Sequence, residues 1–166
     1  TLSPGFSKSF TELQYVSVED NAGEDQYVLA SIDRKTINAS FRVNFNLSPD
    51  LTLQYWGQPY IATGKYSNYK YITDPLAEKF TDRFAPYTED MGNNNFNYQF
   101  FLSNLVARWE YNPGSTIYLV WSQSRDNSAE SGELNLFDDL GDLFNKENDI
   151  PHNVFLIKFS YRFGLR

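Results

Sequence analysis

The sequence predicts an all-β protein, an antiparallel up-and-down sheet that forms about six strands of a larger transmembrane β-barrel, with one short helix in a loop. Three observations predict this fold. Apolar and polar residues alternate with a period of two over several segments. Short and long connections follow one another in turn along the chain. Aromatic residues make up 17% of the sequence, and aromatic side chains favour strands.

The first segments are strand-like but weakly patterned. Residues Thr1 to Gly5 contain a Pro-Gly pair and are expected to form a turn. A turn needs a strand before it, so we expect the chain to be a piece of a longer polypeptide; the alternative is a mature domain that starts in a loop. Strands are expected at 6–19 and 26–36. A bulge or break is expected at 33–36, because the apolar residues change there from even to odd positions.

The clearest strand is 37–47, which alternates without interruption. Its apolar residues are Ile37, Ala39, Phe41, Val43, Phe45 and Leu47. Residues 48–50 predict a three-residue turn into a second strand that keeps the phase. This turn would pair Leu47 with Leu51, Phe45 with Leu53 and Val43 with Tyr55.

A second hairpin repeats the design at 99–111 and 116–125. Its turn is Asn112-Pro113-Gly114-Ser115, and matching the apolar faces requires a loop of odd length. Proline followed by glycine suits a positive φ angle at Gly114. The last strand is expected at 153–165, where apolar residues again take the odd positions.

The longer connections are 20–26, 73–95 and 126–151, and a short helix is expected in the last at about 134–145. Short turns would all lie at one end of the sheet and long loops at the other. Outer-membrane barrels have this plan, with short periplasmic turns and long extracellular loops. A soluble β-sandwich with Greek-key crossovers is the alternative.

Aromatic residues are expected to form two belts at the membrane interfaces. The belt at the short-turn end would contain Trp109, Tyr111, Tyr161 and Phe163. The belt at the loop end would contain Tyr60, Tyr66, Tyr69, Tyr71 and Tyr98. Membrane barrels need about eight strands to close. We therefore expect that residues 1–166 are the C-terminal part of a single barrel domain, or that several chains assemble.

Composition excludes several other classes. A net charge of −7 gives no basic surface for nucleic acid. The absence of cysteine excludes disulfides and thiolate metal sites. The sequence has no apolar run of about 18 residues, which a transmembrane helix would need. The mean hydropathy of −0.52 is compatible with a barrel, because only alternate residues face lipid.

The polar strand positions supply the candidate functional residues. The candidates for a surface facing the barrel lumen are Arg42, Asn44, Gln54, Trp56, Arg108, Glu110, Lys158 and Arg162. Such residues can line a solute path or hold a plug. The alternative is a network of hydrogen bonds and ion pairs that only stiffens the wall.

No catalytic group or cofactor is predicted. His152 is the only histidine, and no Gly-x-Ser-x-Gly motif accompanies it. A weak calcium site is conceivable at Asp138, Asp139 and Asp142, with Glu133 and Glu147 nearby. The spacing does not match an EF-hand, so the wet face of a short helix is the simpler interpretation. Gly57 and Gly64, inside a strand pattern, indicate bulges or close backbone approach.

Three segments resemble a known family. They are LQYWGQPY at 53–60 with GKYS at 64–67 and TDP at 73–75, SNLVARWEYNPGSTIYLVW at 103–121, and NVFLIKFSY at 153–161. They are similar to the C-terminal barrel region of large Bacteroidota outer-membrane proteins of unknown function. That family carries an N-terminal domain similar to family-nine carbohydrate-binding modules. One departure is the C-terminus, where Gly164, Leu165 and Arg166 follow Phe163 instead of a terminal aromatic residue.

The resemblance implies a location in the outer membrane of Gram-negative bacteria and a weak link to glycans, and it assigns no catalytic residues. The expected function is transport or surface handling of a glycan or other polymer. The alternatives are an accessory barrel in a larger envelope complex, or a membrane-anchored hydrolase or carbohydrate-binding protein whose activity resides outside this chain. The expected partners are outer-membrane lipid and the rest of the same barrel or other envelope proteins, with a glycan as a further candidate.

Overall fold

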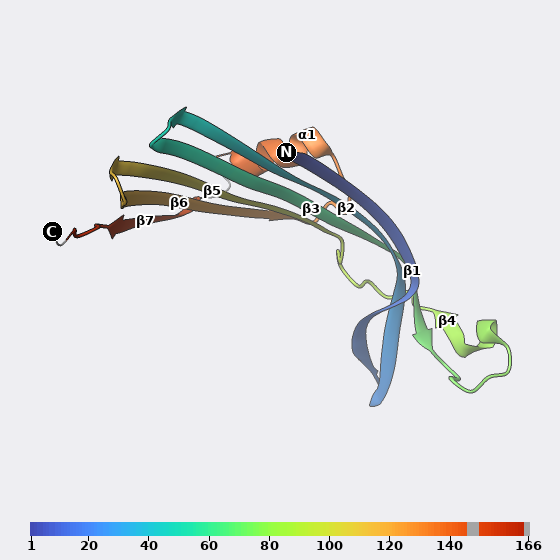
Figure 1. Cartoon of the computed structure of the whole chain (residues 1–166). Coiled ribbons are helices and arrows are strands. Elements are labelled where there is room, and N and C mark those ends of the chain that lie inside the picture. Colours follow the sequence, from blue (N-terminus) through green and yellow to red (C-terminus); the bar gives the residue numbers. More distant parts are fainter. Residues whose placement is uncertain (146–149, 165–166) are drawn as a thin grey trace.

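The structure is a computed structural model, and it describes residues 1–145 and 150–164 (Figure 1). Glu147 of the calcium hypothesis and Leu165 of the predicted last strand lie outside the described residues. The elements are, in order, β1 (Leu2–Asn21), β2 (Glu24–Ser48), β3 (Leu51–Ile72), the 3-10 helix η1 (Phe80–Arg83), β4 (Phe84–Pro86), β5 (Phe96–Asn112), β6 (Ser115–Ala129), α1 (Leu136–Phe144) and β7 (His152–Ser160).

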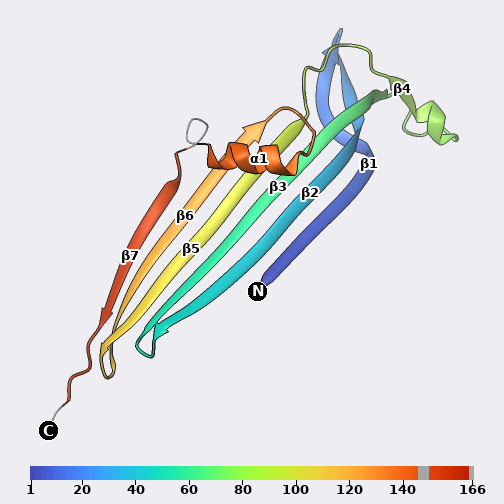
Figure 2. The same cartoon turned by 90° about the horizontal axis from the view of Figure 1, so that it is seen from above.

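The strands form one open antiparallel sheet in the order β1-β2-β3-β5-β6-β7, with short β4 paired to the loop end of β3. The all-β prediction is therefore confirmed, while β1 and β7 remain as edge strands and the sheet is not closed. Figure 2 shows both short turns and the C-terminus at one end of the sheet, and α1, β4 and the β1–β2 hairpin tip at the other. Among the described residues, no helix is long and apolar enough to cross a membrane.

The N-terminal region differs from the prediction. The expected opening turn is part of β1, in which Pro4 and Gly5 pair with Ala39 and Asn38 of β2. Proline is tolerated there because β1 is an edge strand and needs no second ladder. The expected loop at 20–26 is a two-residue turn with positive φ at Ala22 and Gly23, the geometry that suits the twist of a hairpin.

The break expected at 33–36 is absent, because β2 pairs with β3 without a shift from Ser31 to Asn38. Register shifts between the strands occur at other positions. The β1–β2 ladder shifts between Thr11 and Gln14, and the β2–β3 ladder shifts between Leu29 and Ser31. Bulges of this kind let one strand change phase while its neighbour continues. The extra residues lie on β1 and on β3, so the predicted irregularity at 33–36 was placed in the wrong strand.

Both predicted short hairpins are present with a bulge beside the turn. Phe45 pairs with Leu53 and Val43 with Tyr55, as expected, but Leu51 pairs with Ser48 instead of Leu47. In the second hairpin Asn112 pairs with Ser115, and Gly114 has the predicted positive φ of 80°. An extra residue on one strand therefore does what an odd-length loop would do, and the apolar residues of both strands stay on one side.

Register divides the sheet into two faces. One typical row of cross-strand neighbours is Val43, Tyr55, Leu105, Trp121 and Phe155, and the next row is Arg42, Trp56, Asn104, Ser122 and Val154. We call the side of the first row, formed by odd-numbered residues of β2 to β7, the apolar face. The opposite side, formed by even-numbered residues, is the polar face. On the last strands Val106, Val120 and Leu156 interrupt its polar character.

The apolar face is exposed over the half of the sheet near the short turns. Its exposed large side chains include Leu2, Phe6, Val43, Phe45, Leu47, Trp109, Leu119, Phe155, Ile157 and Phe159. Ile157 is 76% exposed although it lies near the middle of β7. The chain thus presents a continuous apolar surface across six strands, far larger than the scattered apolar residues of an ordinary protein surface.

The loop-end boundary of this apolar surface crosses the strands obliquely. On β7 and β6 the apolar side chains end at Phe155 and Trp121, in the same row as Tyr55 of β3. On β3 and β2 they continue past that row to Ile61 and Ile37, which pair with each other. A boundary perpendicular to a barrel axis would cross tilted strands in this oblique way.

Two glycines allow aromatic rings to lie flat on the neighbouring strand. A Cβ atom on Gly57 would lie 2.4 Å from the ring of Phe41, and one on Gly64 would lie 2.3 Å from the ring of Phe96. Each ring belongs to the residue directly opposite in the ladder. Neither glycine marks a bulge, so the close approach predicted for them is made by cross-strand aromatic rings.

Gly114 and Gly141 are predicted to respond in opposite ways to substitution by alanine. Gly114→Ala should destabilise the chain by about 1–2 kcal/mol, because φ is positive and the new Cβ meets Arg162. Gly141→Ala should stabilise it by up to about 1 kcal/mol, because this exposed helical position has no atom within 4 Å of the new Cβ. Urea unfolding followed by circular dichroism in detergent micelles measures both. Shifts of the same sign would contradict the assigned backbone conformations.

Candidate functional site

Seven of the eight candidate lumen-facing residues share the polar face. They are Arg42, Asn44, Gln54, Trp56, Arg108, Glu110 and Lys158. Arg42 pairs with Trp56 and Asn44 with Gln54 across the β2–β3 ladder. The eighth, Arg162, follows the end of β7, and its backbone N–H donates to Ser115 Oγ at 3.1 Å. Register therefore places seven of the eight residues on one side of the sheet.

Part of the polar face is a satisfied network. Arg108 Nη2 lies 3.1 Å from Glu110 Oε2, and the Gly114 N–H donates to Glu110 Oε1 at 2.9 Å. Ser122 Oγ donates to Asn104 Oδ1 at 2.5 Å. Toward β2 the surface is more open, since Arg42 and Asn44 are exposed. The face therefore combines a stiffened region on β5 and β6 with free polar side chains on β2.

The expected aromatic belt at the loop end is on the other side of the sheet. Tyr60, Tyr66 and Tyr98 occupy even positions and lie on the polar face with Trp56. Tyr60 pairs directly with Phe100, and each is 37% exposed. A lipid-facing belt would need odd positions in this part of the sheet, so the prediction was wrong for these three of its five residues. We call Trp56, Tyr60, Phe96, Tyr98 and Phe100 the aromatic stripe; it follows β3 and β5 along the polar face toward the loops.

Helix α1 lies on the apolar face at its loop end and is anchored by a buried carboxylate. Asp139 is 5% exposed. Its Oδ1 accepts hydrogen bonds from Asn97 Nδ2 at 2.7 Å and Gln99 Nε2 at 3.2 Å, and its Oδ2 accepts from the Asn135 N–H at 2.9 Å. Beside this network Phe144 packs against Phe101, with ring centroids 5.0 Å apart. The helix therefore docks through the hydrogen bonds of Asp139, the rings of Phe101 and Phe144, and the fully buried side chain of Leu143.

This arrangement corrects the interpretation of the acidic group. Asp138 and Asp142 are exposed, as expected for a wet helix face, but Asp139 is turned into the sheet. No group of three or more His, Cys, Asp or Glu side chains that could hold a metal occurs among residues 1–145 and 150–164. Asn97 and Gln99 were missed in the sequence, although polar residues in the apolar phase of a strand signal that something polar covers them.

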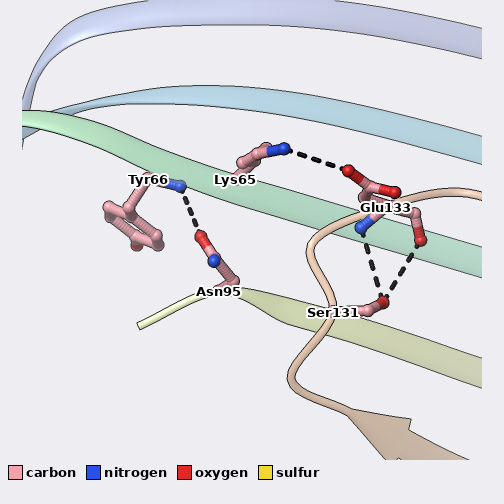
Figure 3. A network of polar contacts seen from close by, with 5 residues as sticks. All are labelled: Lys65, Tyr66, Asn95, Ser131 and Glu133. Atoms are coloured by element: carbon pink, nitrogen blue, oxygen red, sulfur yellow. Dashed lines mark hydrogen bonds and ion pairs between the residues drawn. The ribbon is translucent and has the colours of Figure 1, made fainter. Parts of the chain in front are cut away.

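Two loops are tied to β3 by polar contacts (Figure 3). Lys65 Nζ lies 3.0 Å from Glu133 Oε1, and hydrogen bonding to this ammonium group holds the pKa of Glu133 below its ordinary value. The Tyr66 N–H donates to Asn95 Oδ1 at 2.7 Å, and Ser131 Oγ and the backbone of Glu133 are 3.4 Å apart. Both long loops are therefore fastened at the same level of the sheet.

His152 begins β7, opposite Ser124, and is exposed. No carboxylate or hydroxyl is hydrogen-bonded to it within the described residues. Residues 1–145 and 150–164 therefore form no Ser-His-Asp arrangement around it.

An apolar cleft of about 520 Å³ opens between α1 and the strands β1 to β3. Its lining residues are Pro4, Gly5, Phe6, Ile37, Asn38, Ala39, Pro59, Ile61, Leu136 and Leu140. The cleft belongs to the apolar face and sits at its loop-end boundary. It was not predicted, because a helix lying across strands brings together residues that are distant in the sequence.

Replacing Asp139 by alanine is expected to loosen α1, whereas the neighbouring Asp138→Ala is its matched control. The first change leaves the buried amides of Asn97 and Gln99 without their acceptor, a loss of about 1–3 kcal/mol. The second removes an exposed carboxylate only. Amide hydrogen exchange of residues 136–144 measures the effect, and equal exchange in the two variants would refute the anchoring role.

Comparison with known proteins places most of the chain within one family model. The sequence model of a family described as "Domain of unknown function (DUF5916)" matches residues 2–163. No curated protein and no solved structure matches the chain.

Proposed function

The chain belongs to this family of domains of unknown function, and we propose that it forms part of the wall of an outer-membrane β-barrel that handles a glycan or another polymer. The observation that carries the proposal is the alternation kept in register across six strands, which separates an exposed apolar face from a polar one. A wall between lipid and a water-filled lumen requires this separation.

The open edges support the same conclusion. β1 and β7 each expose one side of their backbone ladder. An open edge is not stable in lipid, where each unpaired backbone group costs several kcal/mol. In the proposed barrel both edges pair with further strands, from the same polypeptide or from other envelope proteins. The short turns and the C-terminus would face the periplasm and the long loops the cell surface.

The polar face supports handling of a solute. The aromatic stripe offers partly exposed ring faces next to the amide groups of Asn38, Gln58 and Asn104 on the same face. Sugar rings have apolar C–H faces and hydroxyl edges, and flat rings flanked by amides complement both. This is the feature of the chain that fits a glycan best. A Bacteroidota origin and an N-terminal carbohydrate-binding domain, which the family resemblance implies, agree with it.

An accessory barrel without conduction is the second candidate. The Arg108–Glu110 pair and the Asn104–Ser122 hydrogen bond favour it, because side chains that satisfy one another stiffen a wall without lining a path. A membrane-anchored hydrolase or binding protein with its activity elsewhere in a longer polypeptide is the third class. The described residues of this chain supply no catalytic constellation for it.

Adjacent residues of one strand are expected to label in opposite ways. The chain has no cysteine, so each introduced cysteine is the only one within it. Four separate variants form two pairs of neighbours: Leu53→Cys and Gln54→Cys on β3, and Leu119→Cys and Val120→Cys on β6. In vesicles containing the folded full-length protein, a water-soluble maleimide should modify the even positions and leave the odd ones largely unmodified. A lipid-borne quencher should give the reverse order with a fluorophore at the same sites. Equal labelling at both members of each pair would refute the wall.

Conduction separates the two leading candidates. In planar bilayers a solute path should conduct ions, and Lys158→Glu on the polar face should shift its selectivity toward cations. Tyr60→Ala in the aromatic stripe should weaken the block of this current by oligosaccharides. Lys79→Glu, exposed in the loop before η1, changes charge equally without lying on the polar face. A wild-type protein that inserts without conducting would favour the accessory barrel.

A further inference from the structure

The α1 cleft is shaped for a chain of methylene groups. Nine of its ten lining residues are apolar, and the tenth, Asn38, belongs by register to the opposite, polar face. Among the described residues no acidic residue lines the cleft. Strands β1 to β3 form its floor, and Leu136 and Leu140 of α1 form one wall. The cleft lies on the apolar face, which the proposed function places against lipid. An apolar cleft in that position is open to the acyl layer and not to the lumen.

Basic side chains stand directly beyond the cleft. Lys8 of β1 pairs with Lys35 of β2, two residues along each strand from the Phe6–Ile37 pair. Residues two apart on a strand share a face, roughly 7 Å from each other. Lys65 of β3 lies one row further on the same face, paired with Asp33. We call Lys8, Lys35 and Lys65 the lysine cluster.

The lysine cluster keeps a positive balance. Lys8 forms an ion pair with Asp33 at 3.5 Å and Lys65 forms one with Glu133 at 3.0 Å. Both pairs are largely exposed, and exposed pairs contribute little to stability. Lys35 makes no ion pair within the described residues and faces the same polar hollow as Lys65 and Glu133. Three ammonium groups against two carboxylates leave one positive charge, on a chain whose net charge is −7.

We propose that the α1 cleft and the lysine cluster together bind one phosphate-bearing lipid of the leaflet at the loop end, with an acyl chain under α1 and the phosphate at the lysines. The inference rests on the proposed membrane wall and adds a specific lipid partner to it. Charge and shape argue for this occupant. A neutral lipid would leave the cluster unused, and a free anion would leave the cleft unfilled. Lysines placed at the headgroup level attract anionic lipid.

The test is native mass spectrometry of the full-length protein released from detergent micelles with titrated phosphatidic acid or phosphatidylcholine. We expect one molecule of phosphatidic acid to bind more tightly than phosphatidylcholine. Lys35→Gln should weaken phosphatidic acid up to about five-fold and leave phosphatidylcholine unchanged. Ala39→Phe should fill the cleft and weaken both lipids without altering charge. Lys79→Gln removes an exposed loop lysine and serves as the control.

The outcomes distinguish this inference from the wall itself. Folded protein that protects its apolar face but binds the two lipids equally, or is unaffected by Lys35→Gln, overturns the lipid site and leaves the wall standing. Complete competition by inorganic phosphate would show a simple anion site and also overturn it. Dimerisation that hides the cleft would replace the lipid by a second copy. A protein that never enters micelles or vesicles would overturn both proposals.

Discussion

Everything in this sheet depends on hydrogen-bonded register. In a strand the side chains alternate between faces, so a slip by one residue in any ladder would exchange the two faces of every strand beyond it. Five strands nevertheless keep their odd residues together from Val43 of β2 to Phe155 of β7, and β1 adds its even residues to the same face. The bulges beside the two short turns make this possible, because each absorbs one residue where a hairpin of even length would otherwise reverse the phase.

The parts that the sequence predicted are those fixed by local pattern. Strict alternation at 37–47 and the turn chemistry at 112–115 gave strands, faces and the positive φ of Gly114 correctly. The errors concern features that depend on distant partners. Tyr60 and Tyr98 were assigned to lipid by their place along the strands, although register puts them on the polar face. Asp139 was assigned to water, because its amide partners on β5 are 40 or more positions away.

Helix α1 lies where the apolar face ends on the loop side of the sheet. It crosses from β6, where Phe144 lies 5.3 Å from the guanidinium of Arg125, to the strands β1 to β3, where it overhangs the cleft. Between α1 and the short turns the face is apolar and exposed. Under α1 itself, Asn97 and Gln99 take the place of apolar residues. One short segment thus covers the amides that lipid could not solvate and leaves room beside them. In the proposed barrel it would mark where hydrocarbon gives way to headgroups.

The order of the strands has a consequence for how the sheet can form. Along the path from β1 to β7 each strand pairs with its neighbour in sequence, apart from the short side strand β4. Each new strand pairing therefore closes only the connection between two consecutive strands. This keeps the loss of chain entropy in each pairing low. Topologies of this kind have low contact order for a β protein and fold faster than Greek-key arrangements of equal size. The sheet can therefore form by adding one hairpin at a time. After each addition, the last strand again exposes an unpaired backbone edge to which the next strand can bind.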